Sequence, residues 1–133
     1  MKAKLSLVLA GFMLVPVLPM LAHHSFDAEY DRTKKVSLKG TVTKLEWMNP
    51  HIWIYLDAKD DKGNVAHWAC EGGPPNSLSR NGWTRNSVKV GDEVQIDGFL
   101  AKAKPNFCNS QNVMLPGGKK VFAGSAEGPD YKQ

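Results

Sequence analysis

The sequence lacks the motifs that mark the common enzyme classes. It has no glycine-rich phosphate loop, no nucleophile elbow and no His-Glu-x-x-His pattern. It has only two cysteines, Cys70 and Cys108, and they do not form a Cys-x-x-Cys redox pair. These absences argue against catalysis.

Long hydrophobic runs are absent after residue 21, so no later segment could span a membrane. Before that point Lys2 and Lys4 precede an apolar run, residues 5–21, which ends at Ala22. This pattern predicts a signal peptide over residues 1–22, cleaved after Ala22, and therefore a periplasmic or secreted protein. The alternative is a retained membrane anchor. A glycine and two prolines interrupt the run, however, and it is shorter than the roughly 20 apolar residues that a span needs.

The sequence also has little excess of positive charge. The chain carries 17 Lys and Arg against 13 Asp and Glu, and removal of the predicted signal peptide takes away Lys2 and Lys4. The processed chain of 111 residues then has a net charge of only +2. No nucleic-acid ligand is expected, because binding to nucleic acid depends on neutralising phosphates.

Two cysteines in an exported protein suggest one disulfide. A bond between Cys70 and Cys108 would stabilise the fold by about 3–4 kcal/mol in the chain-entropy description. The alternative is a pair of buried free thiols.

The processed chain divides into three parts. Residues 23–35 have no sustained hydrophobic period and predict an extended lead-in that packs down through Phe26 and Tyr30. Residues 36–123 carry the strand patterns of one domain, and the polar residues 124–133 predict a disordered tail.

The first predicted strand changes face in its middle. Apolar residues alternate from Val36 to Val42 and then shift parity at Leu45, so we expect a β-bulge near Thr43-Lys44. A long strand that bends in its middle is typical of a small closed barrel. Asn49-Pro50 ends this strand, because proline cannot donate a ladder hydrogen bond.

Residues 51–57 and 65–71 predict a hairpin with one face in the core and the other outward. If residue 57 faces residue 65, His67 pairs with Tyr55 and Glu71 pairs with His51. The core positions are Ile52, Ile54, Leu56, Ala66, Trp68 and Cys70. The outward row is His51, Trp53, Tyr55, His67 and Glu71.

A short helix follows the third strand. Two glycines and two prolines break the strand, Asn76 or Ser77 caps the helix, and Gly82 stops it. Trp83 is expected to pack this helix onto the barrel.

The remaining pattern completes a small barrel. Val94, Ile96 and Gly98 form the inner face of a fourth strand, residues 101–109 predict a polar loop, and residues 111–123 a closing hairpin. The chain is therefore predicted to be mainly β, a small OB-like Greek-key barrel of five to six strands with one short helix between strands 3 and 4. A β-sandwich would need more strands.

Four stretches resemble a family of exported bacterial proteins known as domain-of-unknown-function family 6152. They are AHHSF at the predicted processing site, LKGTVTKLEWMNPHIWIYLD, WACEGGPPNSLSRNGWTRNSVKVGDEV and VMLPGGKKVFAG. The resemblance implies a soluble periplasmic domain. It carries over no catalytic residue, because the family is uncharacterised.

Two sets of histidines are candidate metal ligands. Cleavage after Ala22 would give His23 a free amine beside its imidazole, and with His24 this forms a chelate suited to copper. His51 and His67 with Glu71 could hold zinc or copper with one open position. The N-terminus could also fold over so that His23 and His51 share one metal. The alternatives are that His23 and His24 belong to a solvated chain end and that His51 and His67 are ordinary surface histidines.

The outward pair Trp53 and Tyr55 is the candidate binding platform. The alternative is that the lead-in or the loops of the barrel cover these rings.

The sequence thus predicts an exported, non-catalytic binding or accessory module, whose partner is a small ligand or another periplasmic protein. The second interpretation is a periplasmic copper-binding protein that uses His23 and His24. A metal-dependent enzyme is the third.

Overall fold

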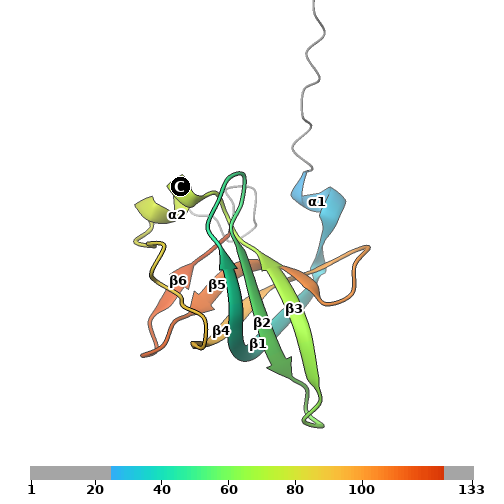
Figure 1. Ribbon diagram of the computed structural model, residues 1–133. Coiled ribbons are helices and arrows are strands. Elements are labelled where there is room, and N and C mark those ends of the chain that lie inside the picture. The colour runs from blue at the N-terminus through green and yellow to red at the C-terminus, as the bar shows by residue number, and fades with distance from the viewer. Residues whose placement is uncertain (1–24, 125–133) are drawn as a thin grey trace, which may run out of the picture.

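The computed structural model describes residues 25–124, which form six strands and two short helices (Figure 1). The predicted signal peptide, His23, His24 and almost all of the predicted tail lie outside the described residues. The elements are α1 (Phe26–Glu29), β1 (Tyr30–Glu46), β2 (Trp53–Lys59), β3 (Val65–Glu71), α2 (Pro75–Arg80), β4 (Glu93–Ala101), β5 (Phe107–Met114) and β6 (Lys120–Phe122).

All six strands belong to one sheet, in the order β3-β2-β1-β4-β5-β6. Neighbours in this order are antiparallel, and an additional parallel pairing joins β3 to β5. This pairing links the two sides of the sheet, so β1 to β5 form a partly closed ring with α2 between β3 and β4. The predicted small OB-like fold, mainly β with a short helix between strands 3 and 4, is confirmed, and α1 is an additional helix.

The long first strand serves both sides of this ring, and it bends where the sequence predicts. β1 pairs with β4 through its first part and with β2 through its second, and its register with β2 shifts between Val42 and Lys44. Gly40 lies against β2, where a Cβ would stand 2.3 Å from the carbonyl oxygen of Asp57. Glycine therefore allows the two strands to approach closely just before the bulge.

The core fills the ring and is closed at one end by α2. Ile52, Ile54 and Leu56 of the second predicted strand are buried, as expected. Trp83 follows the helix, is also buried, and donates a hydrogen bond from Nε1 to the carbonyl oxygen of Phe122 at 2.8 Å. It fixes α2 to the last strand, which confirms its predicted packing role.

The β2–β3 hairpin has the predicted faces in a different register. Asp57 pairs with His67 and Trp53 with Glu71, so the pairing is displaced by two residues from the predicted one. The cause is a tight turn, in which the Asp60 carboxylate accepts hydrogen bonds from the backbone N–H groups of Lys62 and Asn64. The strands therefore extend nearer to the turn. A displacement of two residues keeps every side chain on its face.

Three element boundaries differ from the predictions. Residues 26–29 form α1 and β1 begins at Tyr30, where an extended lead-in was expected. The helix α2 begins at Pro75 behind Pro74, with no side-chain cap from Asn76 or Ser77, because proline suits the first helical position. Strand β5 begins at Phe107, inside the predicted polar loop, because it pairs there with the distant β3.

Neither of the helices within residues 25–124 has the length and apolar character needed to cross a membrane.

Candidate ligand-binding face

The outer face of β2 carries a short row of aromatic rings. Trp53 and Tyr55 are half-buried, while the residues between and beside them point into the core. The rings of Trp53 and Tyr55 are stacked with their centroids 6.5 Å apart. Phe107, at the start of β5, meets Trp53 edge-on at 6.0 Å and an interplanar angle of 74°. The row therefore extends across three strands.

Ala69 on β3 makes this row possible. It is paired directly with Tyr55 on β2 and with Phe107 on β5, and it is buried although it points to the outer face. A methyl side chain leaves room for the larger rings on both sides to approach each other over the middle strand. Sequence reasoning missed Phe107, although the predicted disulfide carried the signal. If Cys70 and Cys108 face each other on parallel strands, as they do here, the residues before them are also neighbours.

A pocket of about 300 Å³ opens beside these rings, between α1 and the β4–β5 loop. Three of its walls are aromatic: Tyr30, Trp53 and Phe107. Its other lining residues are Ala28, Glu29, Ala101, Ala103 and Lys104. The loop is held against α1 by a hydrogen bond of 2.8 Å from the backbone N–H of Lys102 to the carbonyl oxygen of Glu29. One wall of the pocket is therefore supplied by the arm, which we define as residues 25–30.

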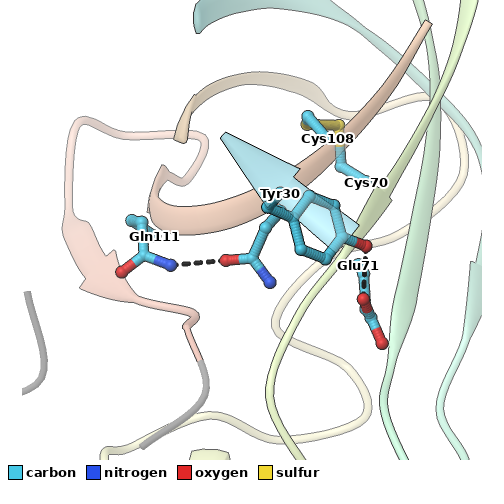
Figure 2. The surroundings of a disulfide bond; sticks show 6 residues. Tyr30, Cys70, Glu71, Cys108 and Gln111 are labelled. Atoms are coloured by element: carbon cyan, nitrogen blue, oxygen red, sulfur yellow. Dashed lines mark hydrogen bonds between the residues drawn. A yellow bond between two sulfur atoms is a disulfide. The ribbon is translucent and has the colours of Figure 1, made fainter. Parts of the chain in front are cut away.

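The arm is anchored by aromatic packing and by one buried carboxylate. Phe26 and Tyr30 are both buried against Phe99, as the sequence predicts for these two residues. The Tyr30 hydroxyl donates a hydrogen bond to Glu71, toward which it points in Figure 2, and Glu71 also binds Nδ1 of His51. Burial and the Glu71 carboxylate raise the pKa of Tyr30 above its ordinary value of 10.0.

Glu71 is consequently buried, with 8% of its surface exposed, although it points to the predicted outward face. The arm covers it, which the alternation of β3 could not reveal.

His67 lies away from this network. Its Nδ1 is 2.5 Å from Asp57 Oδ1, and its side chain is 85% exposed. The Asp57–His67 pair stands four residues along β2 from the Trp53–Glu71 pair, which corresponds to about 13 Å along an antiparallel strand. The structure therefore joins His51 to Glu71 and leaves His67 apart. Within residues 25–124, no three His, Cys, Asp or Glu side chains are grouped as a metal site would require.

Two lysines lie over the ends of the aromatic row. Lys44 Nζ is 5.1 Å from the centroid of Tyr55 and forms an ion pair with Glu46, which also accepts a hydrogen bond of 3.2 Å from the Tyr55 hydroxyl. Lys104 Nζ is likewise 5.1 Å from the centroid of Phe107. A lysine lies over each outer ring of the row, so the half-buried ring of Trp53 in the middle is the surface that a ligand can contact.

The disulfide lies directly beneath this face. Cys70 and Cys108 are fully buried, are register partners in the parallel β3–β5 pairing, and are joined by an S–S bond (Figure 2). The predicted disulfide is confirmed. It ties the strand that carries Ala69 to the strand that carries Phe107.

The chain matches the model of a family of unknown function, DUF6152, over residues 13–107, more than half of its length. The chain belongs to this family. The match to DUF6152 reaches from the predicted signal peptide to Phe107, and so includes the arm, Trp53 and both sides of the pocket. The closing hairpin of β5 and β6 lies almost wholly outside it. The DUF6152 match assigns no residue a role, and no curated protein matches the chain.

Proposed function

We propose that this protein is exported to the periplasm and acts there as a non-catalytic binding module, with the pocket beside Trp53 as its ligand site. The observation that carries this proposal is the pocket itself, in which three aromatic side chains from distant parts of the chain surround a space of about 300 Å³. Small-molecule sites are typically concave, mostly apolar and lined by aromatic side chains. This volume is at the lower end of their usual range, so the ligand is small.

The position of the pocket on the fold supports the same conclusion. OB-type barrels bind ligands on the outer face of strands 2 and 3, between the loops that follow strands 1 and 4. Here Trp53 begins β2 directly after the first of these loops, and Phe107 begins β5 directly after the second. The pocket thus occupies the face on which this architecture presents ligands.

The test is a screen of small aromatic molecules, sugars and short peptides against the processed full-length protein. Binding is read from the indole N–H resonance of Trp53, assigned with a Trp53→Phe variant. We expect at least one class to shift this resonance in a saturable way. Trp53→Ala lacks the resonance, so its affinity for the same compound is compared with that of the wild-type protein by calorimetry, and we expect it to be weaker by tenfold or more, about 1.4 kcal/mol. A Trp47→Phe variant is the control, since Trp47 packs against Trp83 and does not line the pocket. If no compound shifts the Trp53 resonance, the proposal is wrong.

The second candidate function is copper binding by the processed N-terminus. It is favoured by the network around Glu71, which binds both His51 and Tyr30 and so anchors the chain a few residues after His23 and His24. Titration of Cu(II) into protein that begins at His23, and into protein with one additional N-terminal residue, tests it. We expect tight binding only by the first, because the additional residue removes the amine chelate. Equal, weak binding by both would exclude this site.

A further inference from the structure

We infer that the pocket selects small aromatic anions, with the ring of the ligand against Trp53 and Phe107 and its carboxylate at Lys104. This inference rests on the proposed binding function and names the chemical class of its ligand. It follows from the shape of the apolar walls and from the charge at the edge of the pocket.

The walls fit a single aromatic ring. Trp53 and Phe107 stand nearly perpendicular to each other, and both are half-buried, so each presents part of its surface to the pocket. These two rings are in edge-to-face contact and form a corner, in which a ligand ring can stack on one of them and point its edge at the other, the two arrangements that aromatic pairs prefer. The remaining apolar surface consists of alanine methyl groups. These methyl groups fill little of the pocket, and they offer no hydrogen bond to a polar ligand such as a sugar.

The charge at the edge of the pocket favours an anion. Lys104 is exposed, and within residues 25–124 no carboxylate lies within ion-pair distance of its ammonium group. It lies instead over the ring of Phe107. A ligand carboxylate would supply the missing partner while its ring enters the pocket.

The other charged groups nearby already have partners. Lys102 donates a hydrogen bond from its ammonium group to the carbonyl oxygen of Asp27. Glu29, the only carboxylate among the lining residues within 25–124, also interacts with other groups of the chain. A cationic ligand would therefore compete for Glu29 and be repelled by Lys104. The arrangement distinguishes ligands by the sign of their charge.

The experiment compares three ligands with the same ring and different charge. Phenylacetate, phenylacetamide and 2-phenylethylamine are titrated into the processed full-length protein at low salt, with the indole resonance of Trp53 as the readout. We expect phenylacetate to bind about two- to fivefold more tightly than phenylacetamide, the range for a partly exposed ion pair, and the amine to bind most weakly. Added salt should reduce the difference between the first two.

Two lysine variants separate the local charge from the overall charge. Lys104→Gln should abolish the preference for phenylacetate, measured as the ratio of the phenylacetate and phenylacetamide affinities of that variant. Lys62→Gln is the control, because Lys62 is exposed in the β2–β3 turn, has the same charge and does not line the pocket. It should keep the preference.

The possible outcomes test this inference separately from the proposed binding function on which it rests. Equal affinities for phenylacetate and phenylacetamide, tighter binding of the amine, or an unchanged preference in Lys104→Gln would overturn the inference while the pocket stays a binding site. Failure of all three ligands to shift Trp53 would overturn it too, and the wider screen described above then decides the proposed function.

Discussion

Ala69 and Glu71 stand two residues apart on β3 and give its outer face two different environments. Ala69 contributes little volume, so the rings on the neighbouring strands can close over it. Glu71 contributes a buried carboxylate, which is costly unless it is paired, and both Tyr30 and His51 bind it. One residue thus shapes the aromatic row, and the other fixes the arm that forms a wall of the pocket.

The Tyr30→Phe variant tests this network through the pH dependence of the unfolding free energy. The pKa of Tyr30 is raised in the folded state, so the folded protein holds the phenolic proton at a pH at which the unfolded chain, with a pKa near 10.0, loses it. The contribution of Tyr30 to stability is therefore complete below pH 10. Above this value it falls by about 1.4 kcal/mol for each pH unit. Urea unfolding at pH 8 and pH 11 should show a larger loss for the wild-type protein than for Tyr30→Phe.

The matched control for this measurement is Tyr55→Phe. The pKa of Tyr55 is also raised, by burial and by Glu46, but its side chain is half-exposed, so we expect this variant to keep most of the wild-type pH dependence. An identical loss in the wild-type protein and in Tyr30→Phe would show that the Tyr30 proton makes no difference to folding.

Among the elements, the parallel pairing of β3 with β5 has the largest consequence for the site. It covers only three register pairs, from Ala69 with Phe107 to Glu71 with Asn109, and the disulfide is the middle one. These three pairs turn an open sheet into a partly closed ring and bring Phe107 to Trp53. A short pairing between distant strands costs much chain entropy, which the covalent bond reduces.

Removal of the disulfide tests how much it contributes. For a separation of 38 residues, the chain-entropy description predicts that a Cys70→Ala, Cys108→Ala double variant loses about 4 kcal/mol of unfolding free energy. Urea unfolding in non-reducing buffer measures this loss, and wild-type protein reduced in denaturant and alkylated is the comparison. We also expect the amide protons of β3 and β5 to exchange faster than those of β1 and β2 in the double variant. A loss below about 1 kcal/mol would mean that hydrogen bonds and packing alone close the ring.

For the molecule as a whole, the topology gathers distant segments around one face. The arm at the start of the described chain lies beside the β4–β5 loop in Figure 1, and together they line the pocket. The geometry of the aromatic row alone selects no particular polymer, because any flat ring can stack on it. The net charge of only +2 that we predict for the processed chain argues against nucleic acid.

We therefore expect the processed protein to have no measurable affinity for oligonucleotides at physiological salt. Fluorescence anisotropy with labelled single-stranded DNA and RNA is the measurement, on protein from which any basic purification tag has been removed. A dissociation constant below about 100 µM, the weak end of non-specific binding, would contradict this expectation.

Local patterns were sufficient to predict the middle of each strand, the faces of the second strand and the bulge, but not where β1 and β5 begin. The alternation of residues 51–57 separates Ile52 and Ile54 from Trp53 and Tyr55 because side chains in a strand alternate between faces whatever lies around them. The shift at Val42 marks the bulge for the same reason.

Only the tertiary structure decided which of the outward-facing side chains contact each other. Phe107 joins Trp53, Glu71 is buried under Tyr30, and His67 is left on the open surface. The first two depend on pairing between strands far apart in sequence and on how the arm covers the sheet. The third depends on the register of the β2–β3 hairpin. The energies that select such contacts arise between segments, so the spacing of residues within one segment determines the face of a side chain and leaves its partner undetermined.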